Sequence, residues 1–226
     1  MVRNLNFMLN FLIIDDHPLT VSAYVSLLKQ ELNENIYIHT AHNGNDVLVK
    51  TKQLIENNET LDLAIIDYSI AESADKKIKN GMDVAHLLQQ KFKKCKIVFL
   101  TMHNEPLLLH NLHLKFKPEG MISKNDIDSD SFSNIIKDIM TGNFYRSETM
   151  IASLAVLINK KMNFDEIDTQ ILLLLAKQVK SKDLPQYINL SQSALEKRKY
   201  KIKEQILGNK GSDKDLIAMA KAYNLL

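Results

Sequence analysis

Five short apolar runs alternate with five longer segments of helical spacing in the first 140 residues, and this alternation constrains the fold more than any other feature. In the segment 20–32, for example, Val21, Tyr24, Val25 and Leu28 share one helical face. Such alternation predicts an α/β fold, a doubly wound parallel (βα)5 sheet with helices on both faces. The expected strands are FLIID (11–15), NIYIHT (35–40), LDLAIID (61–67), KIVFLT (96–101) and GMIS (120–123), and the expected helices are 20–32, 45–57, 82–92, 105–114 and 130–140.

The pattern changes after Gly142, beyond which only helical segments are predicted. They are 147–160, 164–179, a short segment 181–188 that contains Pro185, 191–207 and 212–226. We therefore expect an all-α bundle behind the α/β region. The predicted division is 9–142 for the first domain, 143–163 for a linker and connecting helix, and 164–226 for the second domain.

Charge is spread unevenly over these two regions. Residues 1–148 carry 16 Lys or Arg against 19 Asp or Glu, a net charge of −3, whereas residues 149–226 carry 13 against 8, a net charge of +5. This asymmetry predicts different partners for the two regions. No apolar run is long enough to span a bilayer, no signal peptide is apparent, and the single cysteine, Cys95, excludes an internal disulfide framework, so we expect a cytoplasmic protein.

Polar side chains follow the ends of four of the predicted strands. Asp15 and Asp16 end the first strand, Asp67 the third and Thr101 the fourth, and Lys124 follows the fifth. Ligands of parallel α/β sheets bind beyond the carboxyl ends of the strands, so these groups are expected to converge. Three carboxylates in one place favour a hard cation such as Mg²⁺, and a hydroxyl and an ammonium beside them suit phosphoryl transfer to a carboxylate.

The constellation resembles the receiver domain of bacterial two-component response regulators, a flavodoxin-like fold, over roughly residues 9–142. DDHP (15–18) and GNFYRS (142–147) resemble the NarL/FixJ subfamily in particular. The resemblance implies that Asp67 accepts a phosphoryl group from a sensor histidine kinase or a small phosphodonor. It also implies a phosphoacceptor and not an enzyme in the usual sense, with at most self-phosphorylation and self-dephosphorylation chemistry.

The same resemblance assigns the remaining roles. Asp16 would bind Mg²⁺ directly and Asp15 through water, with Asp67 and the main-chain carbonyl of Ser69 as further ligands. Thr101 would hydrogen-bond the phosphoryl group and move toward it, and Lys124 would neutralise its charge.

Two features depart from the family pattern. The segment 68–80 is longer by about nine residues than the usual loop and lacks a proline, and we expect a charged, mobile flap beside the site. Met121 stands where the family usually has an aromatic residue that reports the movement of the threonine, so coupling through an aromatic rotamer is in question.

The helix predicted over 191–207 is strongly basic. Leu195, Ile202 and Ile206 share its apolar face, and a short helix precedes it, as in a helix-turn-helix whose second helix enters the major groove. The segment 164–226 resembles the LuxR-type helix-turn-helix. The candidate DNA-binding residues are Ser193, Glu196, Lys197, Arg198, Lys199, Tyr200, Lys201 and Lys203, of which Arg198, Lys199 and Lys203 flank the apolar stripe and are expected to reach sideways to phosphates.

This segment also differs from the LuxR-type pattern. The family usually has other residues at the positions of Pro185, Ala194, Glu196 and Arg198. A glutamate facing the groove repels phosphate but can accept a hydrogen bond from cytosine.

The sequence thus predicts a two-domain response regulator and transcription regulator that binds double-stranded DNA as a homodimer, through the receiver or through an apolar stripe at 150–158. A protein-interaction switch with weak or lost DNA binding is the main alternative. A metal-dependent phosphohydrolase is a further one, although the second aspartate of the haloacid dehalogenase pattern is missing.

Overall fold

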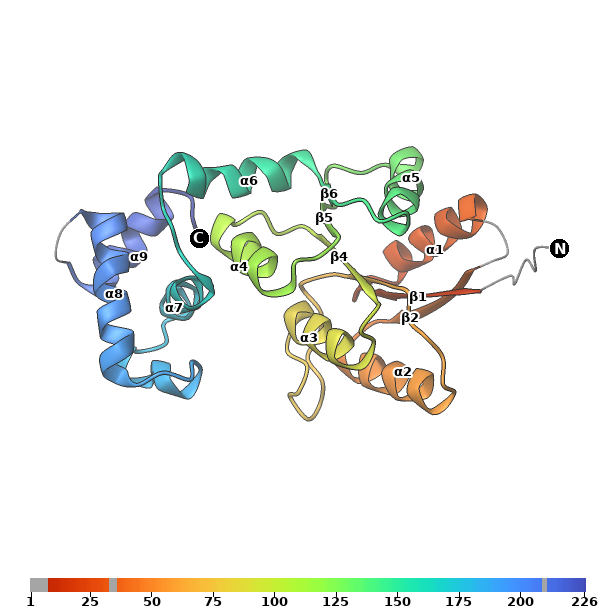
Figure 1. Cartoon of the computed structure of the whole chain (residues 1–226), viewed down its shortest axis with the longest axis horizontal. Coiled ribbons are helices and arrows are strands. Elements are labelled where there is room, and N and C mark those ends of the chain that lie inside the picture. Colours follow the sequence, from red (N-terminus) through yellow and green to blue (C-terminus); the bar gives the residue numbers. More distant parts are fainter. Residues whose placement is uncertain (1–7, 33–35, 209–210) are drawn as a thin grey trace. The chain divides into compact units, whose positions relative to one another are not determined.

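The computed structural model describes residues 8–32, 36–208 and 211–226 (Figure 1). Contacts between residues divide the chain into two compact units, which are treated separately. The first comprises Met1–Met102 and Pro118–Glu148, and the second comprises His103–Lys117 and Thr149–Leu226. None of the helices in the described ranges is both long and apolar enough to cross a membrane.

The first unit is built on a parallel sheet with the strand order β2-β1-β3-β4-β5-β6. The first five strands confirm the predicted (βα)5 sheet. The sixth was not predicted, because its two residues are too few to give a periodic signal. The strands are β1 (Leu9–Ile14), β2 (Ile36–Ala41), β3 (Leu63–Ile66), β4 (Lys96–Thr101), β5 (Gly120–Ser123) and β6 (Tyr145–Arg146).

Helices cover both faces of this sheet. Helices α1 (Pro18–Leu32) and α5 (Ser129–Met140) lie on one face, and α2 (Gly44–Glu56) and α3 (Gly81–Lys91) lie on the other (Figure 1). Phe11 and Ile13 of β1 pack in one core with Val21 of α1 and Phe132 of α5. Burial on both faces explains why the strands lack the apolar and polar alternation of a half-exposed sheet.

The segment 68–80, which was expected to form a charged, mobile flap beside the site, contacts the start of α2, and its mobility stays a prediction. Ala71 forms a β-bridge with Asn43, and the Gly44 amide donates to the Ala71 carbonyl at 2.8 Å. Ile78 is 2% exposed, and its amide donates to Ser73 Oγ at 3.0 Å. A Cβ on Gly44 would lie 2.7 Å from the Ser73 nitrogen, so this close approach requires glycine. The buried isoleucines Ile70 and Ile78 hold the loop in place. The expectation from the sequence considered only the charged residues of this segment.

The second unit is helical, as predicted for the C-terminal region. Its helices are α4 (Pro106–Phe116), α6 (Glu148–Asn159, whose first residue belongs to the first unit), α7 (Glu166–Ala176), the 3-10 helix η2 (Ser181–Gln186), α8 (Gln192–Leu207) and α9 (Asp213–Ala222). Ile171, Leu195 and Ile202 are fully buried in its core.

Helix α4 belongs to this second unit by its contacts. Leu107 lies in the core of the C-terminal helices, and its amide donates to the Leu225 carbonyl at 3.1 Å. His110 Nε2 lies 2.9 Å from the Phe164 carbonyl oxygen. In sequence, α4 falls inside the predicted first domain, 9–142. The predicted division of the chain into 9–142, 143–163 and 164–226 stays a prediction.

Helix α8 begins and ends where the sequence suggested. Ser191 Oγ accepts a hydrogen bond from the Ala194 amide at 3.3 Å, which caps the helix. Gly208, at a φ of 70°, ends it in the left-handed conformation that glycine favours. Pro185 lies inside η2, whose tighter and shorter turn tolerates the missing amide.

Candidate functional site

The carboxyl ends of β1, β3, β4 and β5 bring four of the predicted polar residues to one edge of the sheet. Asp15, Asp67 and Thr101 are 2%, 5% and 0% exposed. Backbone hydrogen bonds hold the strand ends together. The Asp67 amide donates to the Ile14 carbonyl at 2.8 Å, and the Lys124 amide donates to the Thr101 carbonyl at 3.0 Å. Burial of two carboxylates is costly unless a cation or a set of hydrogen bonds compensates it.

Lys124 supplies that compensation. Its Nζ lies 2.6 Å from Asp15 Oδ2 and 2.7 Å from Asp67 Oδ2. Burial alone lowers the pKa of Lys124, but the hydrogen bonds and negative charges of the two aspartates outweigh it, so this pKa lies above its ordinary value. The ammonium therefore stays charged between the two carboxylates.

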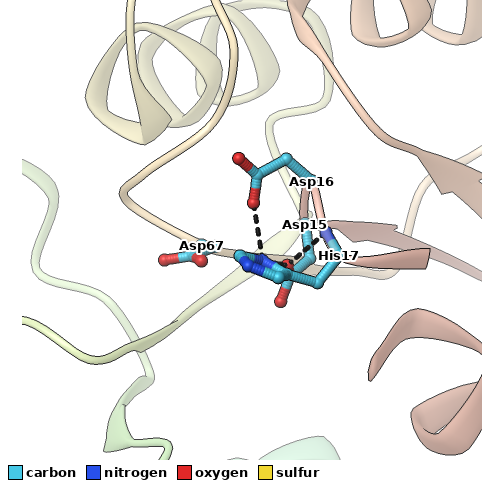
Figure 2. A group of neighbouring side chains, drawn as sticks. All are labelled: Asp15, Asp16, His17 and Asp67. Atoms are coloured by element: carbon cyan, nitrogen blue, oxygen red, sulfur yellow. Dashed lines mark hydrogen bonds and ion pairs between the residues drawn. The ribbon is translucent and has the colours of Figure 1, made fainter. Parts of the chain in front are cut away.

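Asp16 lies beside this pair and is more exposed, with 36% of its side chain open to solvent. His17 Nδ1 lies 2.7 Å from Asp16 Oδ1 and 3.1 Å from Asp15 Oδ1 (Figure 2). Sequence reasoning did not single out His17, although its place directly after the acidic pair was the available signal. The imidazole shares the edge of the sheet with the aspartates, as Figure 2 shows.

The donor set fits a divalent cation. Oxygen atoms of Asp15, Asp16 and Asp67, with a ring nitrogen of His17, lie within 4.8 Å of one another. Carboxylate oxygens are the ligands that Mg²⁺ prefers, and the exposure of Asp16 leaves room for the waters that Mg²⁺ retains.

The backbone around Asp67 is tightly packed. The Ser69 amide donates to Asp67 Oδ1 at 3.2 Å, and the Gly81 amide donates to the Tyr68 carbonyl at 2.8 Å. A Cβ on Gly81 would lie 2.4 Å from the Asp67 carbonyl oxygen, so only glycine permits this approach. The two ends of the 68–80 loop therefore meet beside Asp67. Whether the Ser69 carbonyl binds a cation stays a prediction.

Met121 is fully buried in β5, paired in register with Phe99 of β4. The position at which the receiver family usually has an aromatic residue thus lies inside the sheet, and here a flexible apolar side chain fills it. Tyr24 of α1 is an aromatic residue whose pKa responds to the charges of the site. Burial raises the pKa of its hydroxyl, Lys124 lowers it, and Asp15 and Asp67 raise it further, so the pKa lies above the ordinary tyrosine value.

The candidate DNA-binding residues of α8 fall into two groups in the second unit. Ser193, Glu196, Lys197, Tyr200 and Lys201 are exposed. The other three cations reach sideways, as expected, but to carboxylates of neighbouring elements. Arg198 lies 2.6 Å from Asp165 and 2.8 Å from Asp168, and Lys199 and Lys203 lie 3.0 Å and 2.8 Å from Asp213.

A scan of protein families agrees with the geometry of the sheet edge. Residues 11–137, more than half of the chain, match the model of the response regulator receiver domain. This chain belongs to that family. The match contains the aspartates that meet at the sheet edge, as well as Thr101 and Lys124. A search of curated proteins found no match.

Solved structures extend the similarity to the whole fold. The structure of two RcsB dimers bound to two parallel DNAs aligns with this chain at a TM-score of 0.59 and 20% identity, over 95% of this chain and 98% of that chain. RcsB from Salmonella enterica serovar Typhimurium, bound to the promoter rprA with the phosphomimetic BeF3−, aligns at a TM-score of 0.63 and 18% identity, over 94% and 98% of the two chains. At these identities the fold is shared, so a receiver domain followed by a helical region is confirmed.

Proposed function

We propose that this protein is a two-component response regulator of the cytoplasm, in which Asp67 accepts a phosphoryl group from a sensor histidine kinase and the C-terminal helices bind DNA. The convergence of Lys124 with Asp15 and Asp67 supports the first half most directly, because the three groups come from three different strand ends. Phosphoryl transfer needs mainly positioning and charge neutralisation, which this arrangement supplies.

Asp67 is the proposed nucleophile. Its carboxylate oxygen would form the new bond to phosphorus, while the bond from phosphorus to the imidazole nitrogen of the kinase breaks and that nitrogen keeps the electron pair. Mg²⁺ held by Asp15, Asp16, Asp67 and the Ser69 carbonyl would neutralise charge on the phosphoryl oxygens. Lys124 would turn from the carboxylates to the phosphoryl group, and the Thr101 hydroxyl would donate a hydrogen bond to it. The product is an acyl phosphate, so the chain is a phosphoacceptor and not a turnover enzyme.

Labelling by a small phosphodonor tests the acceptor. Wild-type protein incubated with acetyl phosphate and Mg²⁺ should gain one acid-stable, base-labile phosphoryl group, and Asp67→Asn should gain none. Asp130→Asn, which removes an exposed carboxylate in α5, is the matched control and should label like wild type. Labelling of Asp67→Asn at the wild-type level would disprove the acceptor.

DNA binding by α8 rests on two observations. Lys197, Tyr200 and Lys201 are exposed on a capped helix that follows η2, in the order of a helix-turn-helix. The RcsB structures of similar fold are described as DNA complexes, and one holds RcsB dimers. We propose that this chain likewise binds double-stranded DNA as a homodimer. The phosphoryl group on Asp67 and the exposed lysines of α8 would set its affinity.

A second candidate is a phosphorylation-controlled protein-interaction switch with weak or lost DNA binding. It is favoured by the pairing of Arg198, Lys199 and Lys203 with carboxylates of the same unit, which removes three cations from the charge available to phosphates. Binding of wild-type protein to mixed-sequence duplexes at low salt separates the two candidates, because nonspecific binding is mostly electrostatic. The absence of binding there would favour the protein partner.

A further inference from the structure

Lys199 is a buried lysine in the middle of a basic helix. Only 6% of its side chain is exposed, whereas Lys197 and Lys201 beside it are exposed. At about 100° per residue, a position two residues away lies about 160° around a helix, so Lys199 faces nearly opposite to both neighbours. Its ammonium therefore points into the bundle when the other two point to solvent.

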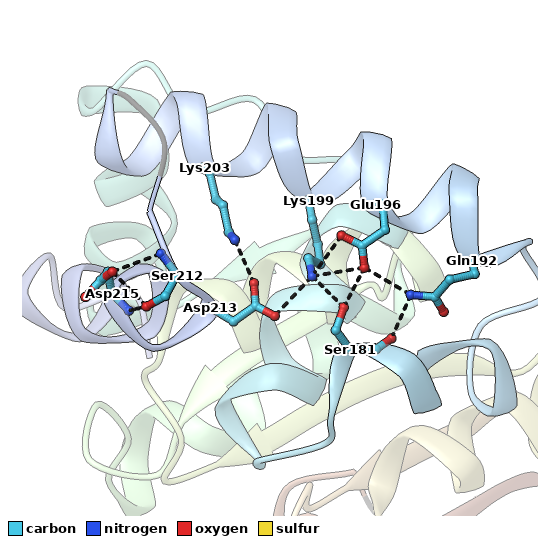
Figure 3. Close-up of polar contacts among 8 residues, drawn as sticks. All are labelled: Ser181, Gln192, Glu196, Lys199, Lys203, Ser212, Asp213 and Asp215. Atoms are coloured by element: carbon cyan, nitrogen blue, oxygen red, sulfur yellow. Dashed lines mark hydrogen bonds and ion pairs between the residues drawn. The ribbon is translucent and has the colours of Figure 1, made fainter.

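Oxygen atoms of three side chains surround this ammonium (Figure 3). Its Nζ donates to Ser181 Oγ, lies 3.1 Å from a carboxylate oxygen of Glu196, and lies 3.0 Å from Asp213 Oδ2. An ammonium has three donors, and each has an acceptor here. Ser181 begins η2, Glu196 is on α8 and Asp213 begins α9, so one side chain connects three helical elements.

The surrounding groups hold one another as well. Ser181 Oγ donates to Glu196 Oε1 at 2.8 Å, and Gln192 Nε2 donates to the same oxygen at 3.0 Å. Lys203 Nζ lies 2.8 Å from the second oxygen of Asp213. Burial raises the pKa of Asp213, but hydrogen bonds from Lys203 and Lys199 outweigh it, and the pKa lies below its ordinary value. Glu196, the residue expected to face DNA, is thus tied to η2 and Lys199 (Figure 3).

Such a network contributes more to geometry than to stability. Desolvation of the buried charges offsets most of the attraction between them, and apolar residues of similar volume in place of a whole buried ion network often cause no loss of stability. The directions of the three hydrogen bonds, by contrast, define one placement of α8 against η2 and α9. An apolar contact at the same place would allow several placements.

We propose that Lys199 is a positioning residue, which fixes the two helices of the helix-turn-helix against each other and against α9, and does not itself contact DNA. The proposal rests on the DNA binding proposed above. By holding α8 at one angle to η2, the network presents Lys197 and Lys201 together on one exposed face. It also withdraws the Glu196 carboxylate from the groove, which relieves the expected repulsion of phosphate.

Three variants test this assignment on duplexes of mixed sequence. Lys199→Met should lower the DNA affinity about tenfold and leave the slope of log affinity against log salt unchanged. It should also lower the melting temperature, because the Glu196 and Asp213 carboxylates stay in place without this cation. Lys199→Arg, which retains donors, should recover most of the affinity. Asp213→Asn should also lower the affinity about threefold or more. This sign is diagnostic, because removal of an anion beside DNA by itself strengthens binding.

Two results would overturn the proposal. One is DNA binding by Asp213→Asn that is as tight as that of wild type or tighter. The other is a loss of about one unit of salt slope in Lys199→Met, which is the mark of a direct phosphate contact. Hydrogen exchange provides a readout without DNA, since the amides that bond the Leu184 carbonyl in η2 should exchange faster in both variants. If wild-type protein binds no DNA, the proposed function fails, and unchanged exchange in η2 would separately overturn the positioning role. If Lys199→Met fails to fold, the milder Asp213→Asn decides both measurements.

Discussion

The ammonium nitrogen of Lys124 lies 2.7 Å from a carboxylate oxygen of Asp67, although 57 residues separate the two along the chain. The same nitrogen lies 2.6 Å from Asp15, so one cation bridges the two buried carboxylates. A divalent cation and Lys124 would therefore act on the same charges. This competition leads to predictions for both metal affinity and stability.

Replacement of Lys124 by methionine should strengthen Mg²⁺ binding about 3- to 10-fold, because a positive charge next to the carboxylates is removed. Isothermal titration of the metal into each protein measures the change. Lys137→Met, which removes an exposed lysine of α5 paired with Glu31, is the control and should bind Mg²⁺ like wild type. Weaker Mg²⁺ binding by Lys124→Met would show that Lys124 does not compete with the cation.

The stability contributed by Lys124 should depend on pH in one direction. Its pKa in the folded state lies above the ordinary value. The stabilisation is therefore complete below the ordinary lysine pKa of about 10.4 and is lost as the pH rises through the folded value. In metal-free buffer at about pH 8, Lys124→Met should cost about 3–5 kcal/mol of unfolding free energy. Denaturant titrations should show this difference shrinking as the pH rises above the ordinary lysine pKa and through the folded value, and a difference that grows with pH would contradict the pairing.

The exposed and the paired cations of α8 should behave differently toward salt. Lys197→Ala combined with Lys201→Ala should lower the slope of log affinity against log salt by up to about 2. Arg198→Ala should leave that slope unchanged, because Asp165 and Asp168 already hold its guanidinium. Fluorescence anisotropy over a salt series gives both slopes. A slope for Arg198→Ala that is about one unit lower than the wild-type slope would place Arg198 at the DNA.

The 68–80 loop should depend on Gly44. A Cβ there meets the Ser73 nitrogen, so Gly44→Ala should loosen the loop and speed tryptic cleavage after Lys76 and Lys77, which are exposed. Val49→Ala, on an exposed position of the same helix, is the control. Cleavage at wild-type rates in Gly44→Ala would mean that the contact does not hold the loop.

The sheet and its acidic edge were predictable because periodic apolar runs and the ends of parallel strands are local signals. The partners of individual cations were not. The position of Lys199 in a run of lysines predicts a solvated or DNA-facing charge, and only the packing of η2 and α9 shows that it is buried. The packing of α4 with the C-terminal helices also depends on contacts between distant segments. Sequence spacing does not encode such contacts.

Control of DNA binding by a phosphoryl group on Asp67 is tested most directly on duplexes that wild-type protein selects from a random pool at low salt. The affinity for these duplexes is then measured with and without acetyl phosphate and Mg²⁺, for wild type and Asp67→Asn. Wild type should bind about fivefold or more tightly when phosphorylated, and Asp67→Asn should not respond. An equal response of the two proteins, or no change in wild-type affinity at full phosphorylation, would contradict the account.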